Sequence, residues 1–178
     1  MLYGSQKRFD KNGDGKVMTL EFEGEINNPE AIARTEYSLS TAIERGVPCE
    51  MMTENQVANW DTAKAQEMMT AQIASLGVEN IEVVFCNNDA MALGALQSIQ
   101  QAGRTVGKDV YLVGVDALVE AVQNVVDGNM TGTVLNDDVG QATKAAEATK
   151  LFVEGKDVEK YYWVDYVKVT TENAAQYL

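Results

Sequence analysis

A run of oxygen-bearing side chains near the start of the chain has the spacing of a calcium-binding loop. Asp10, Asn12 and Asp14 stand at loop positions one, three and five, where hard cations take side-chain oxygen ligands. Gly15 follows at the position that needs a sharp turn, and the carbonyl of Lys16 supplies the next ligand. The spacing therefore predicts a Ca²⁺ site, and an acidic turn without a metal is the alternative interpretation.

The far end of this loop departs from the usual helix–loop–helix arrangement. Met18 stands at position nine and has no oxygen, so a water molecule is expected there. Position twelve is Glu21, but residues 17–23 alternate apolar and polar side chains, which indicates a strand. Because a strand residue does not curl back easily onto its own loop, we expect a carboxylate from elsewhere in the fold to complete the site.

A second group of polar and aromatic residues follows the predicted strands. Its members are Asn28, Glu30, Arg34, Trp60, Asn88, Asp116 and Asn136. Taken singly, an Asp or Asn at such a point is explained as a helix cap. Taken together, a guanidinium, amides, carboxylates and an indole ring are the groups that bind sugar hydroxyls and stack on a sugar face. The loops lack a glycine-rich phosphate cradle with its lysine, which argues against a phosphate ligand.

The elements that must position these residues alternate between strand and helix. Strands are predicted near 17–23, 48–53, 81–86, 110–113, 130–135 and 161–169. Helices are predicted over 28–46, 61–77, 89–103 and 117–127, with a long one up to 155 and a short one opening at 171. This alternation predicts an α/β fold with an open, mostly parallel sheet and helices on both faces. Ligands of such sheets lie past the carboxyl ends of the strands.

Composition narrows the classes of function. The 178 residues are enough for one domain with a sizeable core. A net charge of −13 argues against a nucleic-acid partner, because no basic face is available for phosphates. The chain has no histidine, which removes histidine-dependent nucleophilic catalysis and the usual zinc or copper ligands. Neither a membrane span nor a signal peptide is recognised in it.

Six motifs, in order, resemble one family. They are Asp-x-Asn-x-Asp-Gly at 10–15, Gly-Glu-x-x-Asn-Pro-Glu-Ala-x-Ala-Arg-Thr at 24–35, Asn-Trp-Asp-Thr-Ala at 59–63, Glu-Val-Val-x-x-Asn-Asn-Asp-Ala-Met-Ala at 82–92, Gly-Val-Asp-Ala at 114–117 and Gly-Thr-Val-Leu-Asn-Asp at 132–137. The chain resembles the carboxyl-terminal, flavodoxin-like lobe of the galactose/glucose-binding proteins of bacterial ABC sugar importers, which are type I periplasmic binding proteins. The likeness covers nearly the whole chain.

The resemblance implies roles for individual residues. Arg34, Asn88, Asp116 and Asn136 would hydrogen-bond a hexose, and Trp60 would stack on it. Asn28 and Glu30 stand where the family has His and Asp, at the hydroxymethyl end of the sugar, so the preferred hexose (galactose, glucose or another) is left open. Glu82 would be the distant calcium ligand, with Glu21 as the alternative.

The resemblance also implies how the chain is organised. Residues 1–178 would form a single lobe, with the amino-terminal lobe of the family absent. Residues 137–160 would cross over to pack on that lobe, and without it their apolar stripe is expected to favour a homodimer or a domain swap. The full-length protein would be extracytoplasmic, in the periplasm or at the cell surface, and would deliver its hexose to an ABC permease.

Two other functions remain as alternatives at this stage. A sugar-responsive transcription regulator has an effector lobe of the same fold, although such regulators generally lack the calcium loop. A glycosidase would use Asp116 and Glu30 as its acid/base pair. Acidic residues are abundant in this chain, so such a pairing arises easily by chance, and we expect a binding protein and not an enzyme.

Overall fold

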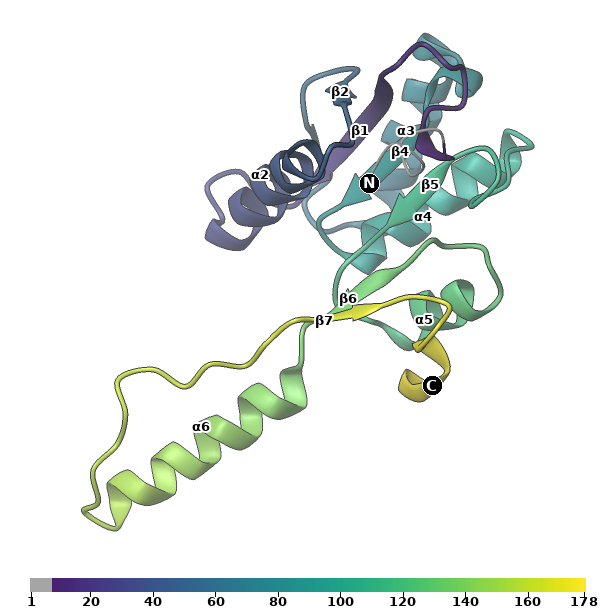
Figure 1. Ribbon diagram of the computed structural model, residues 1–178. Helices are drawn as coiled ribbons and strands as arrows, with labels where there is room; N and C mark the ends of the chain where they lie inside the picture. The colour runs from purple at the N-terminus through teal and green to yellow at the C-terminus, as the bar shows by residue number, and fades with distance from the viewer. Residues whose placement is uncertain (1–7) are drawn as a thin grey trace.

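The computed structural model describes residues 8–178, and most of its strands form one parallel sheet (Figure 1). Its strands are β1 (Val17–Glu23), β2 (Cys49–Met51), β3 (Gln56–Val57), β4 (Val83–Cys86) and β5 (Tyr111–Val113). The order across the sheet is β2-β1-β4-β5, and β3 pairs with the far end of β1. The predicted open parallel sheet is confirmed, and β3 lies in a stretch that the sequence indicated as loop.

The register of the sheet brings the polar residues that follow the strands to one edge. Phe22 of β1 pairs with Cys86 of β4, and Phe85 of β4 pairs with Val113 of β5. All of these pairings are parallel, so the carboxyl ends of the three strands finish side by side. Ligand sites of open α/β sheets are found at this edge.

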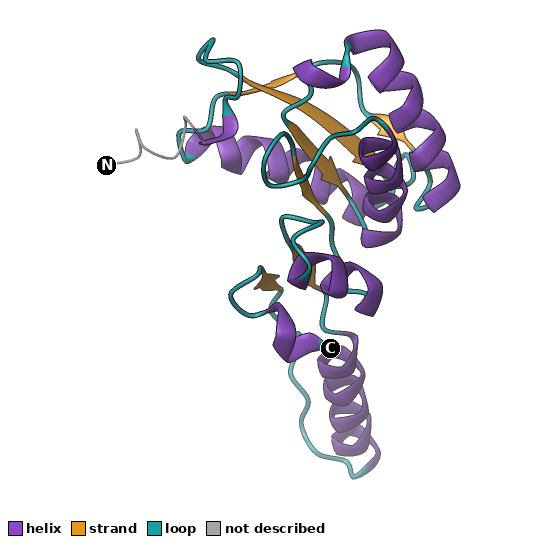
Figure 2. Ribbon diagram, turned by 90° about the vertical axis from the view of Figure 1, so that its right-hand side faces the viewer, coloured by secondary structure: helices purple, strands orange, loops and turns teal. Residues whose placement is uncertain are grey.

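Helices cover both faces of the sheet, as predicted (Figures 1 and 2). Helix α2 (Pro29–Glu44) lies on one face, and α3 (Thr62–Leu76) and α4 (Asp89–Gln101) pack against each other on the other. A short 3₁₀ turn, η1 (Val78–Asn80), follows α3, and α5 (Val119–Val126) follows β5. The side chains of the residues just before α2, α3 and α4 accept backbone N–H groups of the first turn, which is why these helices begin where they do.

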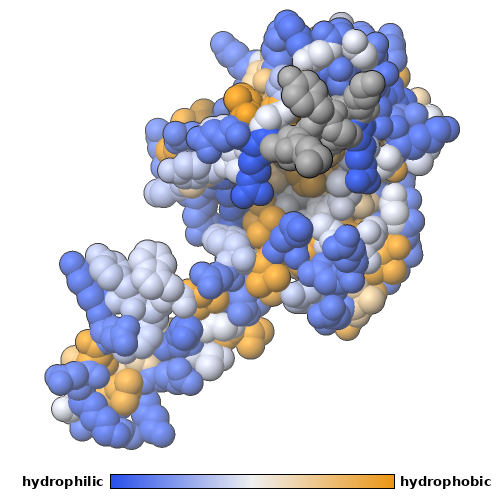
Figure 3. Space-filling model, viewed as in Figure 1, coloured by the Kyte–Doolittle hydropathy of each residue, from blue (hydrophilic) through white to orange (hydrophobic). Residues whose placement is uncertain are grey.

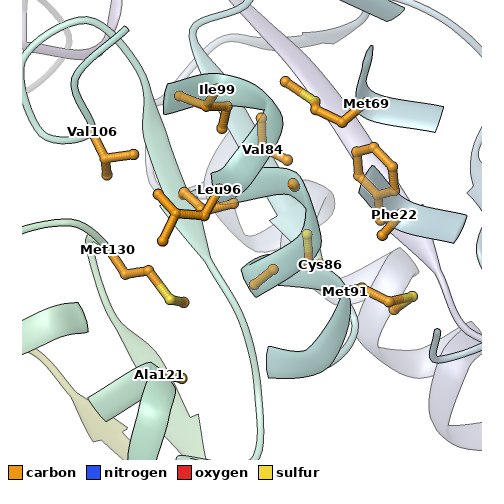
Figure 4. Close-up of a cluster of buried hydrophobic side chains, with 14 of the residues drawn as sticks. Phe22, Met69, Val84, Cys86, Met91, Leu96, Ile99, Val106, Ala121 and Met130 are labelled. Atoms are coloured by element: carbon orange, nitrogen blue, oxygen red, sulfur yellow. The ribbon is translucent and has the colours of Figure 1, made fainter. Parts of the chain in front are cut away.

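The main core lies between the sheet and the α3–α4 layer (Figure 4). Alternate residues of the strands point into it, as a half-buried strand requires. Its fully buried side chains include Leu20, Phe22, Met69, Val84, Met91, Ile99, Leu112 and Met130. A smaller cluster, Val17, Val83 and Tyr111 with Phe9 and Phe85, occupies the opposite face.

The last predicted strand is shorter than the sequence suggested. The sequence predicted a strand over 161–169, but β7 is confined to Val167–Val169. It pairs antiparallel with β6 (Thr133–Leu135), and this pair forms a small second sheet joined to β5 by a single parallel bridge between Val113 and Gly132. The terminal helix predicted to open at 171 is a 3₁₀ turn, η2 (Ala174–Tyr177).

Helix α6 (Asp138–Val153) extends away from the rest of the molecule, and the chain returns beside it (Figures 1 and 2). None of its residues is buried, and Phe152 and Val153 are 72% and 78% exposed. The space-filling view shows apolar surface at the far end of this projection (Figure 3). We call residues 137–164 the projecting arm. Across residues 8–178, the helices are too short or too polar to cross a lipid bilayer.

Candidate functional site

Arg34 is the centre of the candidate site. Helix α2 carries it beside the carboxyl end of β4, where its Nη1 atom donates a 2.8 Å hydrogen bond to the carbonyl of Asn87. The same nitrogen lies 3.7 Å from a carboxylate oxygen of Asp116, and Nη2 lies 3.5 Å from Glu30, one helical turn earlier. A guanidinium held on several sides in this way has a defined orientation and keeps further N–H groups for a ligand.

Two aromatic rings flank this guanidinium. The Cζ atom of Arg34 lies 5.8 Å from the centre of the Trp60 ring and 6.0 Å from that of Tyr166, within cation–π range. Nη2 also donates to the Tyr166 hydroxyl at 3.4 Å. The sequence does not single out Tyr166, because this residue falls inside the strand predicted over 161–169. Its place in an aromatic-rich stretch near the end of the chain was the available signal.

Trp60 is held in place by an unusual backbone. Asn59 and Trp60 both have positive φ angles, 53° and 63°, a conformation that is costly for a residue as bulky as tryptophan. The indole ring lies directly on Gly24, where a Cβ atom would stand 2.2 Å from a ring carbon. Gly24 is therefore required for this ring position.

The two asparagines have both structural and ligand-binding potential. The Oδ1 atom of Asn88 caps α4 by accepting from the backbone N of Met91 at 2.9 Å, and its Nδ2 atom donates weakly to the carbonyl of Trp60 at 3.5 Å. The side chain of Asn136 hydrogen-bonds to Asp116 and accepts from Gln141. Asn88 is thus linked to the residue that carries the indole ring, and Asn136 to the carboxylate beside Arg34. Their contact with a sugar stays a prediction.

The Asp116 carboxyl is partly buried. Burial raises its pKa above the ordinary value, and the Arg34 guanidinium and the Asn136 hydrogen bond oppose that rise. Its φ angle of 116° is strained for a residue with a side chain. Such strain is common where a loop presents a functional group.

Asn28 caps a helix, as Asn88 does. Its Oδ1 atom accepts from the backbone N atoms of Glu30 and Ala31, at 2.9 and 3.2 Å, and so caps α2. Pro29 occupies the first helical position, where a missing N–H costs nothing. The capping explanation that applies to any single asparagine is correct for this oxygen.

Hollows adjoin the Arg34 network. One, of about 470 Å³, is lined by Glu30, Arg34, Tyr37 and Tyr166 among others. Another, of about 310 Å³, lies against the sheet and is lined by Glu21, Arg34 and Phe85 among others. Arg34 borders both, so polar groups stand beside apolar space, as is usual for small-molecule sites.

The amino-terminal loop is folded by its own candidate metal ligands. The two carboxylate oxygens of Asp10 accept from the backbone N atoms of Gly13 and Gly15, at 2.6 and 2.9 Å. Asn12 and Asp14 each accept from the backbone N two residues on, at 2.9 Å. The fourth candidate ligand is the backbone carbonyl of Lys16. The side-chain Nζ atom of Lys16 lies 2.6 Å from a carboxylate oxygen of Glu50, so this ion pair does not involve the carbonyl. These turns bring the oxygen-bearing side chains onto one loop.

The distant carboxylate at this loop is Glu82. Its side chain is buried and accepts from the backbone N atoms of Lys11, Asn12 and Met18. Glu21, the alternative, points instead to Ser38 and Asn87, at 3.0 and 3.1 Å. Within residues 8–178, no three Asp, Glu, Cys or His side chains are gathered closely enough to hold a metal by themselves. Any cation at the loop would therefore depend on amide and carbonyl oxygens as well.

The fold and the site define the chain as a lobe of a periplasmic binding protein. The chain belongs to the family described as periplasmic binding protein domain, which it matches over residues 5–157. It is 34% identical over 178 residues to the D-galactose/methyl-galactoside binding periplasmic protein MglB of Haemophilus influenzae, covering 95% of this chain and 52% of that protein. It is 32% identical over 164 residues to the D-allose-binding periplasmic protein of Escherichia coli, covering 91% and 49%.

Solved structures agree with this assignment. A periplasmic solute binding protein of an ABC transporter from Actinobacillus succinogenes, with bound D-allose, superimposes with a TM-score of 0.83 at 25% identity, over 98% of this chain and 60% of that one. A solute binding protein from Bacillus halodurans with bound myo-inositol gives a TM-score of 0.82 at 27% identity, over 97% and 57%. The chain spans about half the length of the curated relatives cited above.

Proposed function

We propose that this chain is the carboxyl-terminal sugar-binding lobe of the solute-binding component of an ABC-type sugar importer. The observation that carries the proposal is the convergence of Trp60, Asp116 and Glu30 on one guanidinium, that of Arg34. Carboxylates and amides match the paired donor and acceptor character of sugar hydroxyls, and the indole offers a flat surface for stacking. The relatives named above bind galactosides and allose, so a hexose is the proposed ligand.

The proposed mechanism is closure of two lobes on the sugar. In the full-length protein a second lobe would supply the remaining hydrogen bonds and a second stacking surface, and an ABC permease would recognise the closed form. The full-length protein would act outside the cytoplasm. A binding protein is favoured over a glycosidase and over a transcription regulator, because the relatives are named as periplasmic binding proteins.

We further propose that Ca²⁺ is a structural ion of the amino-terminal loop. Its ligands would be Asp10, Asn12, Asp14, the carbonyl of Lys16 and Glu82. The set is entirely oxygen, as Ca²⁺ prefers. The hydrogen bonds between buried Glu82 and the loop support this assignment. Glu82 directly precedes β4, and these bonds hold its carboxylate against the loop. The ion would then tie the loop to the sheet.

Sugar binding is tested by NMR titration of the chain with D-galactose, D-glucose, D-allose and myo-inositol. Because one lobe offers part of a cleft, we expect dissociation constants in the millimolar range, about −4 kcal/mol of binding free energy. Shifts should be confined to the Trp60 indole and to the signals of Arg34, Asn88, Asp116 and Asn136.

A matched pair of variants tests the role of Arg34. Arg34→Met should abolish the shifts, because it keeps the apolar stem of the side chain and removes the donors. Arg45→Met, an exposed arginine at the other end of α2, should leave them intact. Shifts that survive in Arg34→Met, or the absence of shifts with every sugar, would contradict the proposed site.

A further inference from the structure

We propose that Asp89 is a positioning residue that fixes the loop carrying Asp116, and that this loop loosens when Asp89 is protonated. The inference rests on the proposed function, since it assumes that Asp116 meets the ligand. We call residues 114–118 the Asp116 loop. Asp89 does not face the candidate ligand site. It acts through the backbone of the loop.

The contacts of Asp89 attach the Asp116 loop on both sides of Asp116. Asp89 is the first residue of α4, and its side chain is fully buried. Its backbone N donates to the carbonyl of Val115 at 2.7 Å, and its Oδ2 atom accepts from the backbone N of Leu118 at 2.9 Å. Its Oδ1 atom accepts from the hydroxyl of Thr133 in β6 at 2.7 Å. One carboxylate therefore joins α4, the loop and β6.

Close packing around Asp89 restricts the backbone conformation of the Asp116 loop. A Cβ atom on Gly114 would stand 2.3 Å from the Oδ1 atom of Asp89. Asp116 and Ala117 then follow with φ angles of 116° and 56°, which residues with side chains rarely adopt. Strained conformations of this kind persist where surrounding contacts determine them. The Asp89 carboxylate supplies two of those contacts, one directly and one through Thr133, whose hydroxyl accepts from Ala117 N at 3.3 Å.

The electrostatic setting makes this attachment sensitive to pH. Burial raises the pKa of Asp89 to about 7, and the hydrogen bonds from Thr133 and Leu118 partly oppose that rise. The neighbouring charged group is Asp116 on the loop, which raises the pKa further, and the nearby thiol of Cys86 in β4 stays neutral because burial raises its own pKa well above 9.0. The ionised carboxylate accepts with both oxygens, whereas the protonated form keeps one of them occupied by a proton.

The consequence has a definite direction. Above pH 7 the carboxylate holds both Leu118 and Thr133, and the loop is fixed. Below pH 7 the protonated form has lost part of its acceptor capacity, so the hydrogen bonds to Leu118 and Thr133 weaken and Asp116 is less well placed. Sugar affinity should therefore fall as the pH drops through about 7.

NMR of the whole chain across the pH range that brackets 7 tests the inference without any sugar. In the wild type, the backbone amide signals of Leu118 and Ala117 should titrate with a midpoint near the pKa of Asp89, about 7. In Asp89→Asn this titration should disappear, because the amide does not ionise. In Asp89→Ala the signals of the whole loop should move and broaden at every pH.

Ser98→Ala is the matched control. Ser98 is a buried polar residue of the same helix that bonds to Gln66 and Thr70, away from the loop. Loss of the Ser98 hydroxyl should lower the free energy of unfolding and leave the titration of the Leu118 amide signal unchanged. A Leu118 titration that persists in Asp89→Asn, or loop signals that stay in place in Asp89→Ala, would overturn the inference. If Asp89→Ala fails to fold, the Leu118 titration in Asp89→Asn still tests the inference.

A second arm measures D-galactose and D-allose binding by the same signals. Affinity should fall by about tenfold or more in Asp89→Ala, and Asp89→Asn should recover part of it, because the amide keeps one acceptor for Leu118. Ser98→Ala should bind as the wild type does. If the wild type binds neither sugar, the proposed function fails, while the pH titration of Leu118 still confirms or overturns the positioning role.

Discussion

At the scale of single residues, the buried carboxylates Glu82 and Glu21 have partners in different parts of the fold. Glu82 bonds to the amino-terminal loop, whereas Glu21 bonds to Ser38 and Asn87. Both side chains are buried, at positions where an apolar residue is usual for a strand within a core. Buried carboxylates need such partners, because an unpaired buried charge is costly.

The calcium proposal makes a prediction that distinguishes these two residues. If Ca²⁺ binds the folded form and not the unfolded one, it raises the melting temperature, and saturation at about 100 times Kd contributes ~2.7 kcal/mol. The shift between chelator and added Ca²⁺ should be largely lost in Glu82→Gln and retained in Glu21→Gln. Differential scanning calorimetry of each variant under both conditions gives the comparison, and an undiminished shift in Glu82→Gln would refute the assignment.

Glu21 makes a separate prediction about pH. Burial raises the pKa of Glu21 well above 4.5, and the hydrogen bonds from Ser38 and Asn87 only partly oppose it. The folded state therefore holds the Glu21 proton more tightly than the unfolded state does. The resulting contribution of protonated Glu21 to the free energy of unfolding is fully present below pH 4.5, and it is lost as the pH rises through the pKa of the folded state.

Urea denaturation at several pH values checks this sign. Glu21→Gln removes the titration, so the stability of the variant relative to the wild type should increase as the pH rises above 4.5. Other groups, Asp89 included, titrate in both proteins and cancel in the difference. A stability difference that is flat with pH would mean that Glu21 does not titrate in this way.

At the scale of elements, two residues that cap helices are also predicted sugar-binding residues. The residues that cap α2 and α4, Asn28 and Asn88, are among those predicted to touch a sugar. A parallel α/β unit places helix N-termini at the carboxyl ends of the strands, so capping residues and ligand-binding residues compete for the same positions. Sequence alone cannot separate the two roles.

Asn28→Ala tests the capping role. Loss of the bonds to the backbone N atoms of Glu30 and Ala31 should cost about 1 kcal/mol of the free energy of unfolding. Asn28→Asp should retain most of that stability, because its carboxylate still accepts both bonds. Urea denaturation of the three proteins gives the values, and equal stabilities of the alanine and aspartate variants would show that the cap contributes little.

At the scale of the whole molecule, the projecting arm lacks cover among the described residues. Apolar side chains such as Phe152 and Val153 are exposed on α6, and Trp163 is exposed on the returning chain. Apolar surfaces of this kind usually meet a partner. We therefore propose that residues 137–160 mediate a homodimer or a domain swap.

Analytical ultracentrifugation at rising protein concentration tests that proposal. The wild type should show a mass above that of one chain as its concentration increases. A double variant, Phe152→Lys with Val153→Lys, should remain at the mass of one chain, because it replaces apolar contacts with charges. Glu147→Lys introduces the same residue at an exposed polar position of α6 and should still associate. A wild type that stays monomeric throughout would exclude association through this arm.

The pattern of the sequence predicted most elements within a few residues. Asn28-Pro29 and Asp61 mark helix starts that the structure confirms, because capping depends on local chemistry. The strand predicted over 161–169 is mostly wrong. Its aromatic and β-branched residues favour a strand, but β6 offers a partner to Val167–Val169 alone.

The amino-acid sequence by itself determined the order of strands and helices, the polar residues at their junctions and the turns of the amino-terminal loop. Each of these depends on neighbours within a few residues. The tertiary structure decided that Glu82 and not Glu21 meets the loop, that Tyr166 contacts Arg34, and that Asp89 accepts from the backbone N of Leu118 in the Asp116 loop. The residues in these contacts are between 29 and 132 positions apart in the sequence. They meet only because of the way in which the sheet and helices pack, which depends on the whole chain.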